Sequence, residues 1–171
     1  MKTTLKIVFV GVLIALFSTV SAQNIKIAHI NMQDLIFAMP EYEKAMEDLR
    51  KFGQELENEL ELLQVEYRRK LDDYLNNSTN LTELVRRSRE EELGSMQQRI
   101  GMFQQQAQET FELEQHKLMQ PVWEKANKAV ESVAMAQGIT YVITGEPQIL
   151  IFKAVGTLDL LPAVKQHLGI K

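Results

Sequence analysis

Two long runs of apolar residues, separated by a short polar stretch, are the strongest constraint on how this chain folds. Along residues 42–75, and again along 81 to about 118, an apolar residue recurs every three or four positions. The stretch 76–80 between them contains only small polar residues. Such a period is typical of amphipathic helices, and two of them joined by a short turn bury their apolar stripes against each other. The pattern predicts one long antiparallel helical hairpin.

The pairing of apolar residues also predicts a register for the hairpin. If the chain turns at Ser78, the numbers of facing residues sum to 156. Leu60 then faces Met96, and Gly53 faces Phe103. A shift of one or two residues would place most of the apolar residues opposite glutamine, glutamate or arginine. A coiled-coil seam made of matched apolar residues therefore favours this register.

The first 22 residues have the features of a secretory signal peptide. Lys2 and Lys6 give a basic start, an apolar run follows at 7–17, and small residues end at Ala22. That run is shorter than the ~20 apolar residues that span a bilayer. We therefore expect cleavage after Ala22 and an exported, soluble mature chain consisting of a single domain, residues 23–171.

Short apolar segments near the two ends of the mature chain predict a small body. The segments 25–30, 139–144 and 148–153 are rich in isoleucine and are bounded by turn residues, which is typical of strands. Asp159 is the expected cap of a final helix that ends near Leu168. The body then comprises about 23–40 and 138–171, and the fold class is α+β.

Proline, asparagine and glycine mark the ends of the predicted arm. Pro40 suits the first turn of a helix, and Asn80 is the expected N-cap of the second helix. Pro121 lies inside that helix and is expected to kink it, and Gly138 is expected to end it. The helical arm is thus predicted at about 41–137, with its tip at 76–80.

The composition argues against several classes of function. The net charge of −4 gives no electrostatic basis for binding nucleic acid, and it does not favour contact with an anionic membrane surface. The chain has no cysteine, no glycine-rich phosphate loop, and three histidines without the spacing of metal ligands. We therefore expect no metal site, no cofactor, no catalytic residues and no enzymatic activity.

Some apolar residues of the arm point away from the predicted seam. Isolated apolar residues are common on protein surfaces and need no function. Methionine and tryptophan are nevertheless favoured on adaptable binding surfaces. These positions are therefore the candidate contacts for a bound chain or for a neighbouring subunit: Leu62, Val65, Met102, Leu113, Met119 and Trp123.

Basic residues from both helices meet near the predicted tip. Acidic residues are interleaved with them, so the ordinary interpretation is a helix surface with ion pairs, and attraction of acidic partners is the alternative. The cluster consists of Arg68, Arg69, Lys70, Arg86, Arg87 and Arg89.

Three motifs together resemble the Skp/OmpH family of periplasmic chaperones. They are the opening stretch 27–35 with Met39-Pro40-Glu41-Tyr42, the stretch 121–130 leading to Gly138, and the closing segment 159–164. The resemblance covers essentially all of the mature chain. It implies a homotrimer with a small β body, from which three helical hairpins surround a cavity.

The resemblance also implies a function, which is to hold unfolded outer-membrane proteins in the periplasm without ATP and keep them from aggregating. A structural coiled-coil scaffold or spacer in the cell envelope is the alternative, because it needs the same hairpin and the same oligomerising base. Three short strands and a two-helix seam form a marginal core, which independently favours oligomerisation.

Overall fold

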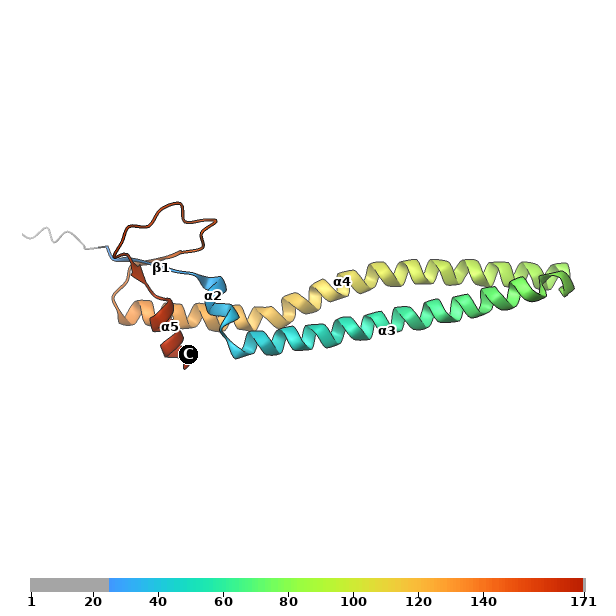
Figure 1. The fold of residues 1–171 in the computed structure, drawn as a ribbon, viewed down its shortest axis with the longest axis horizontal. Helices are drawn as coiled ribbons and strands as arrows, with labels where there is room; N and C mark the ends of the chain where they lie inside the picture. Colours follow the sequence, from blue (N-terminus) through green and yellow to red (C-terminus); the bar gives the residue numbers. More distant parts are fainter. Residues whose placement is uncertain (1–24, 171) are drawn as a thin grey trace, which may run out of the picture.

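The computed structural model describes residues 25–170, so the predicted signal peptide lies outside the described residues. Two long helices, α3 (Pro40–Asn77) and α4 (Glu83–Ala136), run side by side and form an arm (Figure 1). The remaining elements gather at the end of the arm that holds the start of α3 and the end of α4. The predicted hairpin projecting from a small body is confirmed.

The body contains three short strands and two short helices. The strands are β1 (Ile27–Ile30), β2 (Tyr141–Thr144) and β3 (Leu158–Asp159). The helices are α2 (Met32–Phe37) and α5 (Leu161–Leu168).

All strands of the sheet are parallel, in the order β2-β1-β3. The central strand β1 pairs Ile27 with Tyr141 on one side and Ala28 with Leu158 on the other. Parallel neighbours need long crossover connections. The whole arm connects β1 to β2, and a loop connects β2 to β3.

The prediction of a strand at 148–153 is wrong. This segment lies in the loop between β2 and β3, which extends away from the sheet (Figure 1). The third strand is instead Leu158–Asp159. The isoleucine-rich composition of 148–153 has strand propensity, but propensity alone supplies no partner strand, and both sides of β1 are already occupied.

Local signals explain where the helices begin and end. The Asn31 side chain caps α2 by accepting hydrogen bonds from the backbone N–H groups of Gln33 and Asp34, at 3.1 and 3.2 Å. Pro40 occupies the first turn of α3, as predicted. Gly138 follows α4 with a φ of +65°, a left-handed conformation that glycine adopts at little steric cost.

The N-cap of the second arm helix lies two residues beyond the predicted position. Thr82, rather than Asn80, is the N-cap of α4, and its hydroxyl accepts a hydrogen bond from the backbone N–H of Val85 at 3.4 Å. Residues Ser78–Asn80 form a turn of 3₁₀ helix instead. The Asp159 carboxylate does bond to the start of α5, accepting from the backbone N–H of Leu161 at 2.9 Å.

The hydrophobic core lies where the end of α4 meets the body. Buried residues of β1, α2 and α5 pack there against Val122, Ala126, Ala129 and Val133 of α4. Small alanine side chains let α2 and α5 approach α4 closely. Helix α4 continues unbroken through Pro121, and it bends between the body and the arm (Figure 1).

The predicted register of the hairpin is wrong. The Tyr67 hydroxyl accepts a hydrogen bond from the Gln97 side chain at 2.6 Å. The Phe111 ring lies 3.2 Å from the position that a Cβ on Gly53 would take, although Phe103 was the predicted partner of this glycine. In both contacts, the residue on α4 lies eight positions beyond the predicted one.

The error has a physical origin. Sliding one helix along the other does not rotate it, so the apolar stripe of each helix still faces the other after a shift of eight residues. Direct matching of apolar residues is not required, because Leu60 and Leu56 lie level with Gln104 and Gln108 in the observed register. The observed register places Phe111 opposite Gly53, which has no side chain and leaves room for the aromatic ring.

Cross-linking is expected to distinguish the two registers. Cysteines that replace Tyr67 and Gln97 should be joined within one chain by a short bismaleimide. Cysteines that replace Tyr67 and Arg89, the pair predicted from the sequence, should react poorly, because eight residues of helix displace the second thiol by about 12 Å. Mass spectrometry of the digested monomer band reports which peptides are joined, and preferential linkage of the second pair would contradict the observed register.

Candidate functional site

The seam of the arm buries little of its apolar surface completely. Leu49 and Leu93 are buried, whereas Leu56, Leu60 and Leu63 are only half-buried. Each helix has a single neighbour along the arm, so its outer face stays in solvent. The arm is therefore a narrow rod with an extensive accessible surface.

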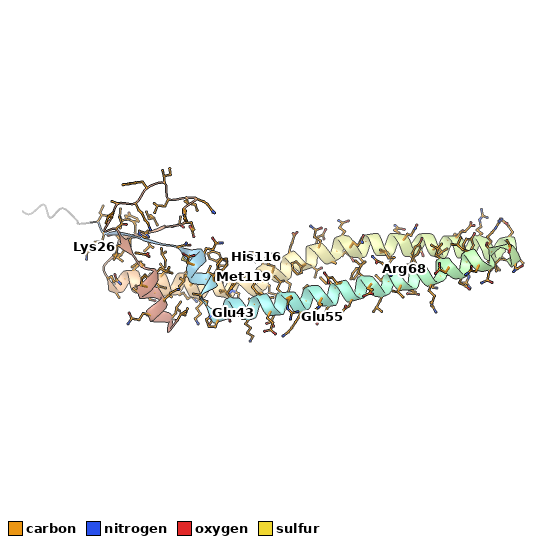
Figure 2. The ribbon with its side chains drawn as sticks, viewed as in Figure 1. Lys26, Glu43, Glu55, Arg68, His116 and Met119 are labelled. Carbon is orange, nitrogen blue, oxygen red and sulfur yellow. The ribbon has the colours of Figure 1, made fainter. Side chains whose placement is uncertain are left out.

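Five of the six apolar residues predicted to point away from the seam are exposed. The most exposed are Leu113, Leu62 and Met102, which retain 72%, 70% and 54% of their accessible surface. Val65 and Trp123 are also exposed. Met119 is half-buried and packs against the core of the body, where it lies on α4 near the start of α3 (Figure 2).

A second set of exposed apolar residues lies in the body, and it was not among the sequence-predicted sites. In the loop between β2 and β3, Ile151 and Val155 are fully exposed and Phe152 is 79% exposed. Tyr141 and Ile143 on β2 are exposed as well. Large apolar side chains exposed together mark a contact surface more often than they mark an ordinary surface. The signal available in the sequence was the run of isoleucine and phenylalanine that was assigned to a strand.

The basic residues near the tip form a network of ion pairs. Lys70 of α3 pairs with Glu92 of α4, and Arg89 also reaches Glu92 at 3.0 Å. Arg86 pairs with Glu83 one turn earlier. The ordinary interpretation of a paired helix surface thus holds for these three residues.

The other three basic residues make weaker contacts. Arg68 donates a hydrogen bond to the Gln64 carbonyl at 3.4 Å. Arg69 and Arg87 have no ion-pair partner within the described part of the chain. Arg69 and Arg89 line a groove of about 290 Å³ together with Lys70 and Asp73.

The two cations beside Glu92 affect its ionisation. Hydrogen bonds from Lys70 and Arg89 stabilise the carboxylate and hold the pKa of Glu92 below its ordinary value. A lowered folded-state pKa means that the contribution to stability is fully present above the ordinary glutamate value of about 4.3. It is lost as the pH falls through the lowered pKa.

We expect Lys70→Gln to raise the pKa of Glu92 toward its ordinary value, because the first of its two cationic partners is removed. Titration of the side-chain carboxyl carbons by NMR measures this shift. Lys51→Gln, which removes a cation of α3 that pairs with Glu47, is the matched control and should leave Glu92 unchanged. An unchanged Glu92 titration in the Lys70 variant would contradict the pairing.

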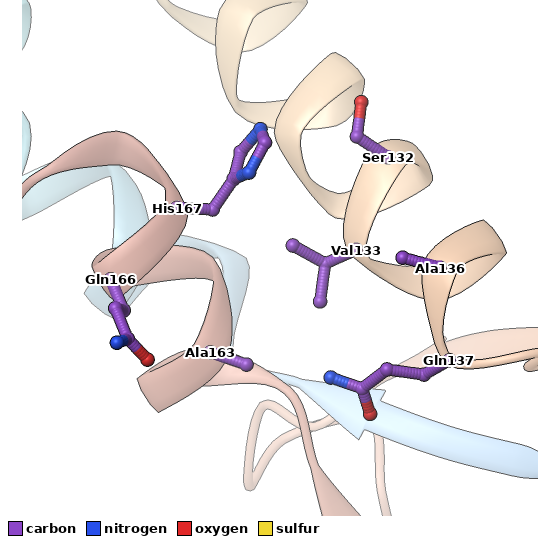
Figure 3. A pocket seen from close by; sticks show the side chains of 7 residues that line it. All are labelled: Ser132, Val133, Ala136, Gln137, Ala163, Gln166 and His167. Atoms are coloured by element: carbon purple, nitrogen blue, oxygen red, sulfur yellow. The ribbon is translucent and has the colours of Figure 1, made fainter.

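An open groove lies in the body between α4 and α5. It has a volume of about 360 Å³ and is lined by Ser132, Val133, Gln137, Ala163 and His167, among others (Figure 3). The His167 ring points toward α4 across this groove. The groove contains no cluster of carboxylates or nucleophiles that would suggest catalysis.

The three histidines lie on three different elements, β1, α4 and α5. His29 is buried in β1, with its Nδ1 4.0 Å from the Asp159 carboxylate, whereas His116 lies on the exposed arm. Between residues 25 and 170, no three His, Cys, Asp or Glu side chains are placed to hold a metal ion. No helix in the same range is long and apolar enough to cross a membrane.

Comparison with known proteins agrees with this architecture. A crystal structure from Caulobacter crescentus, described as an OmpH-like outer membrane chaperone, matches with a TM-score of 0.73. The match covers 84% of this chain and 83% of that chain, and at 13% sequence identity it shows a shared fold. A search of curated proteins gave no match. The family model for "Outer membrane protein (OmpH-like)" matches residues 26–168, and the chain therefore belongs to the OmpH-like family.

Proposed function

We propose that this protein is an ATP-independent holdase that binds unfolded outer-membrane proteins in the periplasm and prevents their aggregation. The observation that carries this proposal is the arm, a rod that keeps large apolar side chains in solvent along both of its helices. Membership of the OmpH-like family supports the choice of client. Export would follow cleavage after Ala22.

Exposed apolar residues that are spread along a rod suit a holdase. An unfolded chain exposes apolar side chains at irregular intervals, and each of them can contact the arm weakly. Several weak contacts on one client raise the overall affinity through a high effective concentration. Each contact still breaks easily, so release requires no nucleotide.

We also propose that the protein works as a homotrimer assembled through its body. The exposed apolar loop residues and the free edges of β2 and β3 are surfaces that association would bury. Three arms extending from one base would surround a client from several sides.

Aggregation of a client tests the proposal against the scaffold alternative. A barrel protein of the outer membrane is unfolded in urea and diluted into buffer with the purified protein, and light scattering is followed. Suppression near one trimer per client supports a holdase. No suppression at a large excess would overturn the proposal and favour a scaffold that binds only folded partners.

We expect the variant L62Q/V65Q/M102Q/L113Q to lose most of this suppression. The four side chains are exposed, so their replacement should change the free energy of unfolding by only about ±0.5 kcal/mol each. The control N58Q/S88Q/S95Q/T110Q introduces glutamine at four exposed polar positions of the same helices and should suppress aggregation as the parent does. Circular dichroism checks that both variants keep their helices. Full suppression by the first variant would exclude these residues as client contacts.

A further inference from the structure

The middle of the arm has a charge distribution unlike that of its ends. The mid-arm is defined as residues 52–66 of α3 and 100–114 of α4; in the observed register 52–64 lie opposite 100–112. Near one end of this segment Phe111 contacts Gly53, and just beyond the other end Tyr67 bonds to Gln97. The mid-arm contains no lysine or arginine, and it contains eight glutamates: Glu55, Glu57, Glu59, Glu61, Glu66, Glu109, Glu112 and Glu114.

Only Glu66 and Glu114 of these eight residues form ion pairs, with Lys70 and Lys117, and Glu109 and Glu112 accept hydrogen bonds from glutamine side chains. Glu55, Glu57, Glu59 and Glu61 are exposed, and none has an ion-pair partner within 4.0 Å in the described part of the chain. Glu55 lies on the arm between Glu43 and Arg68 (Figure 2). Tightly paired surface charges cancel each other's field at a distance, but these four do not. The mid-arm is therefore a source of negative potential.

Exposed apolar side chains lie among these carboxylates. On a helix, neighbours three or four residues apart share a face. Leu62 therefore shares its face with Glu59 in the preceding turn, and with Val65 and Glu66 in the following turn. On α4, Glu109 precedes Leu113 by four residues, and Lys117, which pairs with Glu114 at 2.9 Å, follows it. The negative surround is therefore centred on Leu62 of α3, whose side chain lies among the glutamates of that helix.

This combination limits what can occupy the face. A second arm of this protein would bring an identical set of carboxylates against it, and like charges repel. Nucleic acid and anionic lipid would be repelled in the same way. A chain that carries both apolar and cationic residues would gain from both features of the surface, through apolar contact and through charge complementarity.

We propose that the mid-arm is a docking surface for unfolded polypeptide segments rich in lysine and arginine as well as apolar residues. This inference rests on the proposed holdase function and adds a preference by charge among clients. The apolar side chains supply contact that does not depend on salt. The carboxylates speed encounter and favour cationic segments over anionic ones.

Two unfolded probe chains of similar length and opposite charge test the preference. Lysozyme that has been reduced and carboxamidomethylated is a basic chain without a stable fold, and α-lactalbumin treated in the same way is an acidic one. Each is labelled with a fluorophore, and its binding to the full-length mature protein is measured by anisotropy in EDTA. We expect about tenfold tighter binding of the basic chain at low salt, and a much smaller difference at 1 M salt, where the Debye length is about 3 Å.

Two variants with the same change of net charge locate the effect. E55Q/E57Q/E59Q/E61Q removes the unpaired mid-arm carboxylates, and glutamine has about the helix propensity of glutamate. The matched control removes four exposed carboxylates outside the mid-arm: E43Q/E91Q/E124Q/E131Q. We expect the first variant to lose most of the preference for the basic chain and the control to keep it.

The outcomes separate this inference from the proposed function. If both chains bind equally at low salt, or if the acidic chain binds more tightly, the charge preference is wrong and the holdase remains. If the two variants behave alike, the mid-arm is not the site. If neither chain binds although aggregation of the barrel protein is still suppressed, the docking surface is wrong and the holdase remains. If sedimentation shows that the protein forms larger assemblies at low salt than at high salt, the mid-arm binds the basic tips of other copies rather than client segments.

Discussion

Leu35→Ala is expected to lower the free energy of unfolding by about 2–5 kcal/mol, the usual range when a fully buried leucine is truncated. Leu35 has no exposed surface, and α2, which carries it, packs against both α4 and α5. The body is small, so few other side chains could shift to fill the resulting cavity. Urea unfolding followed by Trp123 fluorescence and by circular dichroism measures the loss.

The matched control is Leu84→Ala, which makes the same chemical change at a position that is 79% exposed. Its effect should stay within about ±0.5 kcal/mol. Both variants are compared with the parent at one protein concentration, because association makes apparent stability depend on concentration. A loss below about 1 kcal/mol for Leu35→Ala would show that the core around α2 is loose enough to collapse onto the smaller side chain.

The sequence predicted the arm well because the arm is a local structure. A helix forms through contacts between residues three or four apart, and the apolar period along 42–75 and 81–118 records those contacts directly. Pro40 and Gly138 marked the ends of the arm for equally local reasons. The start of α4 was misplaced at Asn80 because several adjacent residues, including Thr82, are good N-caps.

Long-range pairings could not be predicted in the same way. The two apolar stripes face each other wherever one helix stands along the other, so the apolar period of each helix does not determine the register of the hairpin. The order of the sheet requires the loop between β2 and β3 to pass from one side of β1 to the other. The residues 148–153 have strand propensity, and nothing in their local sequence shows that they find no partner strand. For the hairpin register and for the strand order alike, the residues of one segment do not show which other segment they pair with.

The candidate surface was predicted only in part, because some of its residues depend on the local helical pattern and others depend on long-range packing. A helical wheel placed Leu62 and Leu113 away from the seam, and both are exposed. The wheel did not place Met119 against the body, because that contact depends on how α4 packs beyond the arm.

Replacing Ile151, Phe152 and Val155 together with serine is expected to convert the proposed trimer into monomers. All three are almost fully exposed, so they contribute little to the fold of a single chain. Burial of each in an interface would contribute about 1.5–3 kcal/mol, and the triple change would remove at most about 4.5–9 kcal/mol per chain. A loss of this size far exceeds the 1.4 kcal/mol that changes an association constant tenfold. Sedimentation equilibrium at micromolar concentration measures the mass.

Serine at three exposed apolar positions of the arm provides the control. L62S/L84S/L113S removes a comparable apolar surface at a distance from the body, and it should leave the mass unchanged. The parent must sediment at three times the mass of the mature chain, and a stable folded monomer would overturn the trimer itself. A trimeric loop variant would instead exclude the loop as the interface, leaving the exposed apolar side chains of the sheet, Ile27, Tyr141, Ile143 and Leu158, as the remaining surface. Because the loop lies outside the core, unchanged helicity of the monomeric variant would show that assembly, rather than folding, depends on these side chains.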